Sequence, residues 1–348
     1  MKKKIAIACQ GGGSQTAFTA GVLKAFFERN VHKENQIVSL SGTSGGAVCA
    51  TLSWYSLIKT SKGDTTPVEQ RLLDFWRDNS TQNIFEKGFN DLLINYLELA
   101  DKGLLPKWEI APESPVAKAM FSASTAMLPR RSFYDFEALL KSHIDFEEIR
   151  SWDRPSSPVL LIGAADVCNG TFRKFNSSTE DIRVEFLLAS AAVPSIFPAV
   201  RIGKDIYWDG LFSDNPPTDE LLDPDIVGIE NKPDEIWIIQ INPRECKDVP
   251  DTPEEIVDRR NEMIGNESLF QDISKIELIN KLLRKGAFAK DFLDNYHYRI
   301  VEIRIVQPSE ELQESLSYAT KISRDADYIN MLIHDGEQQG RTFLKSLS

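Results

Sequence analysis

Two copies of one pattern, a short apolar run followed by a glycine-rich turn and an apolar helix, occupy the first 60 residues of this 348-residue chain. The runs at residues 4–8 and 37–40 are typical of short buried strands. The helices predicted after the two turns cover residues 15–27 and 47–58 and are apolar nearly all round. Successive strand–turn–helix units predict a parallel sheet with helices on its faces, so we expect an α/β protein.

The rest of the chain continues this alternation after one long interruption. Further strands are predicted at residues 159–166 and 171–175 around an Asn169-Gly170 turn, in a hairpin at 201–208 that turns at Gly203, and at 235–241 and 298–306. Further helices are predicted at residues 67–79, 183–192, 253–284 with a break near Gly265, and 323–344. Residues from about 85 to 141 are less regular, which indicates an insertion or cap over the sheet.

Charge and cysteine content exclude several classes of protein. Lys and Arg number 40 and Asp and Glu number 52, so the formal net charge is -12. Such a surface repels nucleic acid and leaves any membrane contact to a local patch. The three lysines at the start precede only four apolar residues, fewer than the roughly 7–15 of a signal-peptide core, so a first strand is expected there. The scattered cysteines (Cys9, Cys49, Cys168 and Cys246) predict neither a disulfide framework nor a zinc site and fit a reducing cytoplasm.

The second glycine turn contains Gly42-x-Ser44-x-Gly46, the pattern of a nucleophile elbow. A serine on a tight strand-to-helix turn stands clear of the sheet edge, and small neighbours leave room where the turn packs closely. The helix after Ser44 would also present its positive dipole end to developing negative charge. A plain Gly/Ser turn is the alternative, but the predicted strand and helix on either side favour a nucleophile.

The first glycine turn, Gly11-Gly12-Gly13, allows three interpretations. A phosphate cradle of a nucleotide-binding unit is one, but the G-x-G-x-x-G spacing fails at Thr16. An oxyanion hole is the second, because adjacent parallel strands would place these backbone N–H groups beside Ser44. A turn that merely requires glycine is the third. The elbow next to it favours the oxyanion hole.

A serine nucleophile requires a base, and no histidine has an obvious position for that role. His297 is the best of the four, because it follows an aspartate in the Ser–Asp–His order of α/β-hydrolases. Asp209 in Tyr207-Trp208-Asp209-Gly210 is the better candidate, since it ends an aromatic strand where partial burial would raise its pKa. The alternative for Asp209 is the Asp-Gly turn of a hairpin.

Together these motifs resemble the patatin-like phospholipases. The resemblance rests on Gly11-Gly12-Gly13-Ser14-Gln15, on Gly42-Thr43-Ser44-Gly45-Gly46, on Asp209-Gly210, and on the segment from Ala189 to Pro198 that precedes the aspartate. It covers residues 4–220 well and the remainder loosely. Two positions depart from the family pattern: Gln15 stands where Arg or Lys is usual, and Leu211 where a small residue is usual.

The resemblance implies a three-layer α/β/α fold with a mainly parallel sheet and a Ser44–Asp209 dyad without histidine. It also implies an oxyanion hole in the glycine loop, with Gly42 and Gly46 shaping the elbow, and lipid acyl hydrolysis without metal or cofactor. The candidate oxyanion donors are the N–H groups of Gly11, Gly12, Gly13, Ser14 and Gly45. Residues 4–220 would then form the catalytic core, with the cap at 85–141, and residues 221–348 would complete the same domain.

The sequence therefore predicts a cytoplasmic serine hydrolase of the phospholipase A or carboxylesterase type. An acyltransferase or thioesterase with the same dyad is an alternative, and a nucleotide-binding regulator is an alternative of another class. Peripheral membrane contact is expected through residues 102–131, where basic residues exceed acidic ones beside apolar side chains. The residues of this expected contact are Lys102, Lys107, Lys118, Arg130 and Arg131, against Glu109 and Glu113, with Leu104, Leu105, Trp108, Met120, Phe121, Met127 and Leu128.

Overall fold

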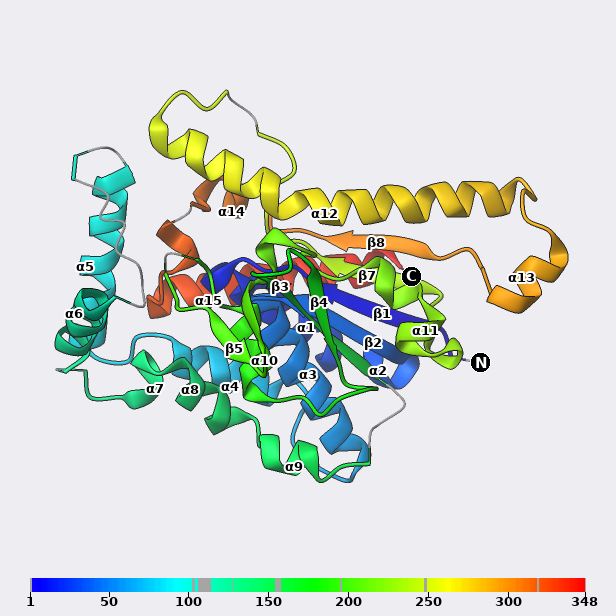
Figure 1. Cartoon of the computed structure of the whole chain (residues 1–348), viewed down its shortest axis with the longest axis horizontal. Helices are drawn as coiled ribbons and strands as arrows, with labels where there is room; N and C mark the ends of the chain where they lie inside the picture. Colours follow the sequence, from blue (N-terminus) through cyan, green and yellow to red (C-terminus); the bar gives the residue numbers. More distant parts are fainter. Residues whose placement is uncertain are drawn as a thin grey trace.

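A single mixed sheet of eight strands forms the centre of the molecule in the computed structural model (Figure 1). The structure describes residues 2–101, 104–105, 114–126, 128–153, 158–194, 196–246, 249–317 and 319–347. The strands are β1 Lys4–Cys9, β2 Gln36–Thr43, β3 Val159–Asp166, β4 Phe172–Asn176, β5 Val200–Ile202, β6 Asp205–Asp209, β7 Glu235–Ile239 and β8 Glu302–Val306. Their order is β5-β6-β3-β2-β1-β7-β8, and β4 pairs with β3 in addition. Strands β3, β2, β1, β7 and β8 run parallel, whereas β4, β5 and β6 add antiparallel pairs.

Helices cover both faces of this sheet, as the sequence predicts. The main helices are α1 Ala17–Glu28, α3 Gly45–Ser61, α4 Gln70–Asn79, α5 Ile84–Asp101, α6 Pro115–Thr125, α8 Phe136–His143, α10 Val184–Ser190, α12 Pro253–Arg284 and α15 Ala326–Ser346. The short helices are α2 Val31–Glu34, α7 Arg131–Tyr134, α9 Phe146–Arg150, α11 Pro224–Val227, α13 Lys290–Tyr296 and α14 Glu310–Ser315, with 3-10 turns η1 Gly13–Thr16, η2 Gly210–Phe212, η3 Asp219–Leu222, η4 Ile229–Asn231 and η5 Ala319–Lys321.

Side chains along the parallel strands alternate between two buried cores, which gives the three-layer arrangement. Ile5 and Ile7 of β1 belong to the larger core, which is shared with α1, α3 and α15. Ala6 and Ala8 point to the other face and pack with residues of α12. Because both faces of β1 are covered, its side chains from Ile5 to Cys9 are apolar without interruption, as expected for a parallel strand between two layers of helices. Figure 1 shows α12 on one side of the sheet and α1 and α3 on the other.

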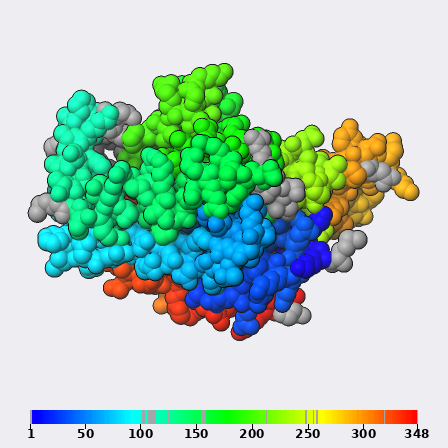
Figure 2. All heavy atoms as spheres, turned by 90° about the horizontal axis from the view of Figure 1, so that it is seen from below, coloured from blue at the N-terminus to red at the C-terminus, as the bar shows by residue number. Residues whose placement is uncertain are grey.

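Two predictions about the helices were wrong. Helix α12 continues through Gly265 without a break. The supposedly irregular segment 85–141 is mostly helical where the structure describes it, with α5 and α6 as its longest helices. Figure 2 shows this cap, coloured teal and cyan, at one end of the molecule and the orange residues near 290 at the other.

The register of β3 brings two distant segments together at one point of the sheet. Thr43, the last residue of β2, pairs with Gly163 of β3. The next residue of β3, Ala164, pairs with Asp209 at the end of β6. Ala164 also pairs with β4, which lies along the opposite edge of β3. β6 must therefore lie along the same edge of β3 as β2, and it begins to pair where β2 ends. The ends of β2 and β6 therefore meet, and Ser44 and Asp209 lie at this junction.

Candidate active site

Ser44 occupies the sharp turn between β2 and α3. Its backbone has φ 56° and ψ −131°, a conformation that is unfavourable for any residue with a side chain. The turn is possible because glycines lie where it packs most closely. A Cβ on Gly42 would lie 2.6 Å from the carbonyl carbon of Gly46, and one on Gly46 would lie 2.3 Å from the carbonyl oxygen of Cys9. This geometry is that of a nucleophile elbow, and Ser44 is only 8% exposed.

A buried serine from α10 supports the elbow. The Ser44 backbone N–H donates to Ser190 Oγ at 2.9 Å, and the Ser190 hydroxyl donates to the carbonyl of Gly163 at 2.7 Å. Ser190 therefore links the elbow to β3 and is fully buried. The sequence places Ser190 in the segment that resembles the family but gives no sign of this contact, which depends on the packing of α10.

Asp209 lies at the end of β6 and is 1% exposed. Its Oδ1 accepts the backbone N–H of Leu211 at 2.8 Å, whereas Oδ2 is buried and has no hydrogen-bond partner of good geometry among the described residues. Burial raises the pKa of Asp209 to about 7, and the Ser44 hydroxyl, the Leu211 N–H and the charge of Lys321 each oppose that rise. The structure thus places a carboxyl group that titrates near neutrality within interaction distance of the Ser44 hydroxyl.

The glycine loop lies directly against the elbow. A Cβ on Gly11 would lie 3.0 Å from Ser44 Cβ, and one on Gly45 would lie 2.6 Å from the carbonyl oxygen of Gly13. The Gly11 N–H is already engaged, because it donates to Asn215 Oδ1 at 2.7 Å. For the other candidate donors within the described chain, the structure gives no hydrogen-bond acceptor: these are the backbone N–H groups of Gly12, Gly13, Ser14 and Gly45.

Asn215 and Gln10 fasten the glycine loop to α12. The Asn215 side chain accepts from Gly11 and donates from Nδ2 to the carbonyl of Gly265 at 3.0 Å. Gln10 donates to the same carbonyl at 3.1 Å and to Asn266 Oδ1 at 2.8 Å. Both side chains are fully or almost fully buried. Neither was predicted, because these partners lie between 50 and 256 residues away in the sequence.

The C-terminal part of the chain completes the surroundings of the loop. Gln15 donates to the carbonyl of Ser317 and to Thr320 Oγ1, both at 2.9 Å. The Lys321 ammonium donates to Asn242 Oδ1 at 3.1 Å, and its positive charge lowers the pKa of Asp209. The neutral Gln15, at a position where Arg or Lys is usual, thus holds the segment from Ser317 to Thr320. The next residue of that segment, Lys321, supplies a positive charge near Asp209.

The structure does not bring a histidine to this site. His297 is exposed, follows α13 and adopts a left-handed conformation. His143 forms a contact with Asp78 at 3.2 Å, and the His334 ring contacts Gln338 on the same helix. No histidine within the described ranges hydrogen-bonds to Ser44 or Asp209, so no histidine joins these two residues in a triad.

The cap exposes apolar side chains but pairs two of its predicted basic residues. Leu104 is 70% exposed, and Met120 and Phe121 are 56% and 55% exposed. Arg130, by contrast, forms two hydrogen bonds of 2.7 Å with the buried Glu86. Arg131 forms one hydrogen bond of 2.9 Å with Asp135 on the protein surface. Lys102, Lys107, Trp108, Glu109, Glu113 and Met127 lie outside the described residues, and no helix among the described ones is sufficiently long and apolar to span a membrane.

The fold and the site define an α/β protein with a serine elbow at the carboxyl end of β2 and a buried aspartate at the end of β6, both paired with β3. The chain belongs to the family described as Patatin-like phospholipase, whose sequence profile matches residues 7–222. This result confirms the resemblance indicated by the motifs, together with the predicted α/β fold. Family membership connects the chain with lipid hydrolysis in general.

Solved structures of two bacterial proteins align with almost the whole length of the chain. VipD from Legionella pneumophila aligns with 99% of this chain and 67% of its own, at 16% identity and a TM-score of 0.45. The ExoU–SpcU complex from the type III secretion system of Pseudomonas aeruginosa aligns with 99% of this chain and 51% of its own, at 15% identity and a TM-score of 0.33. The chain thus spans between about half and two thirds of these proteins. No curated protein sequence matches it significantly.

Proposed function

We propose that this chain hydrolyses acyl esters of lipids, as a phospholipase A or carboxylesterase, with Ser44 as nucleophile and Asp209 as its base. The observation that carries the proposal is the strained, buried Ser44 at the N-terminus of α3, beside a buried aspartate whose pKa is raised to about 7. Unfavourable backbone conformations persist where the surroundings enforce them, and they concentrate at functional sites. A carboxyl group that titrates near the working pH suits a general base.

The first half of the reaction forms an acyl-enzyme. Ser44 Oγ attacks the ester carbonyl carbon while its proton passes to Asp209, for which the unpartnered Oδ2 is the natural acceptor. The carbonyl oxygen takes the negative charge and is stabilised by backbone N–H groups of the glycine loop and elbow. Since Gly11 already donates to Asn215, the proposed donors narrow to Gly12, Gly13, Ser14 and Gly45. Collapse of the intermediate breaks the ester C–O bond, and the leaving alcohol takes the proton from Asp209.

The second half releases the fatty acid. Water attacks the acyl carbon, Asp209 accepts a proton from that water, and the same donors stabilise the second oxyanion. The intermediate then breaks its bond to Ser44 Oγ, which recovers the proton from Asp209. A carboxyl group with a pKa near 7 can exchange this proton in both directions at neutral pH, which supports a base that works without histidine.

A fluorophosphonate probe tests the nucleophile directly. The probe should label the wild-type chain at Ser44, and a preparation of Ser44→Ala should show neither labelling nor more than a few per cent of the ester hydrolysis. The Ala side chain keeps the Cβ on which the elbow packs, so circular dichroism and Tm should remain close to those of the wild type. Labelling at another residue, or hydrolysis retained by a clean Ser44→Ala preparation, would overturn the assignment.

Product analysis decides between hydrolysis and transfer. With a phospholipid substrate and a lysolipid or alcohol added as acceptor, a hydrolase should release free fatty acid as its main product. Transfer of most of the acyl chain to the added acceptor would instead assign the acyltransferase alternative, with the same dyad and the same acyl-enzyme.

We further propose that the cap, α5 together with α6, carries the peripheral membrane contact. This proposal is supported by exposed apolar side chains on the two helices, including Leu92 at 72% and Val116 at 59% exposure. The basic charge expected there contributes less than the sequence predicts, because Arg130 and Arg131 form ion pairs within the protein. Insertion of apolar side chains, more than attraction of basic ones, would therefore provide the contact.

A further inference from the structure

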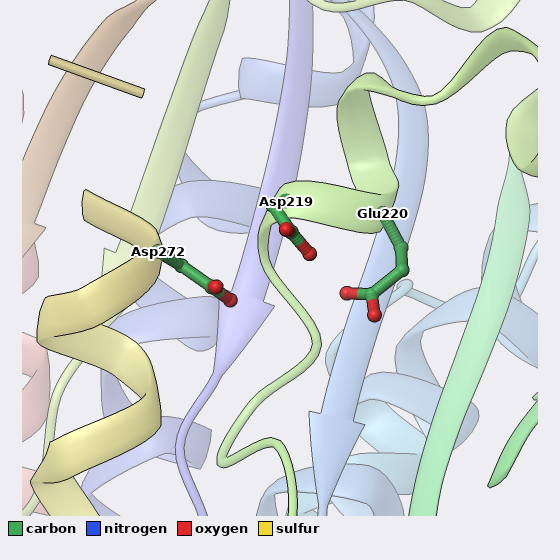
Figure 3. A group of neighbouring side chains, drawn as sticks. All are labelled: Asp219, Glu220 and Asp272. Carbon is green, nitrogen blue, oxygen red and sulfur yellow. The ribbon is translucent and has the colours of Figure 1, made fainter. Parts of the chain in front are cut away.

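The segment that carries Asp209 and Asn215 continues into η3, where acidic side chains gather against α12. Asp219 and Glu220 come from η3 and Asp272 comes from α12. One carboxylate oxygen from each of the three lies within 4.8 Å of the other two. Figure 3 shows the three carboxylate groups converging on the space between the two elements.

Two lysines only partly neutralise this group. The Lys174 ammonium lies 2.6 Å from Asp214 and 2.5 Å from Glu220, and the Lys275 ammonium pairs with Asp219 and lies 3.4 Å from Asp272 Oδ1. Within the described chain, four carboxylates thus share two ammonium groups. With all four carboxyl groups ionised, the formal count leaves two negative charges over the two ammonium groups in a mostly buried place, where charge is costly unless it is compensated.

Two carboxylate oxygens of this group are buried and have no hydrogen-bond donor in the described part of the chain. Asp272 is 6% exposed, yet its Oδ2 has no hydrogen-bond partner among the described residues, and the same holds for Glu220 Oε2. A buried carboxylate oxygen without a donor is the feature that a bound cation would account for.

We propose that Asp219, Glu220 and Asp272 form a binding site for one Ca²⁺ ion that ties α12 to η3. The donors are all oxygens, which hard cations prefer, and Ca²⁺ accepts several carboxylates in irregular geometry, whereas Mg²⁺ usually retains most of its water. A divalent charge matches the excess of two negative charges at the cluster. The remaining ligands would be water, because the side of the site at Asp219 is partly exposed.

The proposed ion would act on the active site through structure and not through chemistry. Helix α12 offers the carbonyl of Gly265 to both Gln10 and Asn215, and Asn215 in turn holds Gly11 of the glycine loop. An ion between Asp272 and η3 would fix the same helix two turns further along, against the same segment that carries Asn215. The site is therefore separate from the dyad, and its presence does not depend on the proposed reaction.

Calorimetry and thermal unfolding of the full chain test this proposal. After treatment with EDTA and dialysis, titration with CaCl₂ should show one site per chain. At a Ca²⁺ concentration about 100-fold above the Kd, the Tm should rise by roughly 5 °C. Absence of binding at millimolar Ca²⁺ would overturn the proposal and leave a proton shared between the carboxyl groups as the explanation. Equal affinity for MgCl₂ would support the site and overturn the choice of ion.

Matched variants then assign the binding to the cluster. Asp272→Asn should lose at least about 10-fold in Ca²⁺ affinity, together with most of the Ca²⁺-dependent rise in Tm. Glu277→Gln is the control, because it removes the same charge from an exposed position of the same helix and should bind as the wild type does. Glu220→Gln serves as the second variant if Asp272→Asn does not fold. Wild-type affinity in both cluster variants would place the ion elsewhere and overturn the proposal.

Discussion

The elbow junction and the cap meet opposite physical requirements. At the junction of β2 and β6, Ser44 and Asp209 are at least 92% buried and are held by Ser190 and Leu211. In the cap, Leu92 is 72% exposed and large apolar side chains point into water. Bond-making chemistry needs groups fixed in advance, whereas contact with a lipid surface needs apolar area that is free to be covered. Variants of the junction should therefore lose activity on a soluble short-chain ester and on anionic vesicles alike, whereas variants of the cap should lose it on vesicles only.

The largest effect after loss of the nucleophile is expected from Asp209→Asn. Asparagine keeps the size of the side chain and the acceptor for Leu211 but cannot take the serine proton, so kcat should fall on the order of 10³–10⁴-fold on both substrates. His297→Ala should stay within about twofold of the wild type, since that histidine is exposed, follows α13 and has no hydrogen bond to Ser44 or Asp209. The opposite ranking of these two variants would indicate a Ser–Asp–His triad.

The same substitution should alter stability in a direction that identifies the buried acid. The pKa of Asp209 is raised from 3.8 to about 7 in the folded chain, so the stability it contributes is present below pH about 4 and is lost as pH rises through 7. Asparagine does not ionise, so the Asp209→Asn variant does not lose stability in this way as the pH rises. The variant should therefore have a higher Tm than the wild type at pH 8 and a similar Tm at pH 4, as measured by calorimetry. A lower Tm at pH 8 would show that the carboxylate is compensated in the folded state.

Asn215→Ala should have the next largest effect, on both substrates alike. The change releases the Gly11 N–H and one of the two side chains that hold the Gly265 carbonyl, so the glycine loop loses its fixed position. Small displacements of catalytic groups can cost about 100-fold in rate, and we expect a decrease in kcat of about 10- to 100-fold with a smaller change in KM. A loss restricted to vesicles would mean that Asn215 serves the cap and not the junction.

The pH dependence should reveal the base and the cation that lowers its pKa. Because Asp209 must be ionised to accept a proton, kcat/KM should rise with pH through a midpoint near 7 and level off above it. Lys321→Met removes a charge that lowers this pKa, so the midpoint should move to higher pH and activity at pH 7 should fall severalfold. His297→Ala should leave the midpoint unchanged. An unchanged midpoint in Lys321→Met would show that the charge of Lys321 does not affect the pKa of the catalytic base.

The sequence predicted the junction better than its supports, and the reason is physical. Ser44 lies in a short motif with its own signature, because the turn leaves no room for a Cβ at Gly42 beside Gly46 and the close approach of Cys9 leaves none at Gly46. Ser190 and Asn215, by contrast, act across 146 and 204 residues of sequence, through a register that no local pattern encodes. Their hydrogen bonds appear only after β3, β6 and α10 are assembled.

Two predictions about helices failed because tertiary packing and exposure also affect which residues form a helix. A break was expected in α12 because glycine disfavours helix, yet Gly265 lies where a Cβ would be 2.7 Å from Asn242 Nδ2. Tertiary packing therefore outweighs helix propensity at this position. The cap was predicted as irregular because it contains several Gly and Pro residues and only short apolar clusters, although α5 and α6 form helices with many of those apolar side chains exposed. Exposed apolar residues blur the pattern from which helices are predicted.

The smallest effect, and the one that distinguishes the two regions most directly, is expected from the cap. Replacing Met120 and Phe121 of α6 by Ser should lower activity about three- to tenfold on anionic vesicles, because each removes exposed apolar area worth on the order of 1 kcal/mol at an interface. Activity on a soluble short-chain ester should not change, since the dyad is untouched.

Phe172 and Met331, at 53% and 45% exposure on β4 and α15, provide the matched control pair, and their replacement by Ser should leave both activities intact. Equal losses on both substrates would make α6 a lid over the pocket, and loss in the control pair would show that exposed apolar area anywhere on the molecule contributes. Only a loss confined to vesicles and to α6 supports a cap that docks on lipid while the junction performs the chemistry.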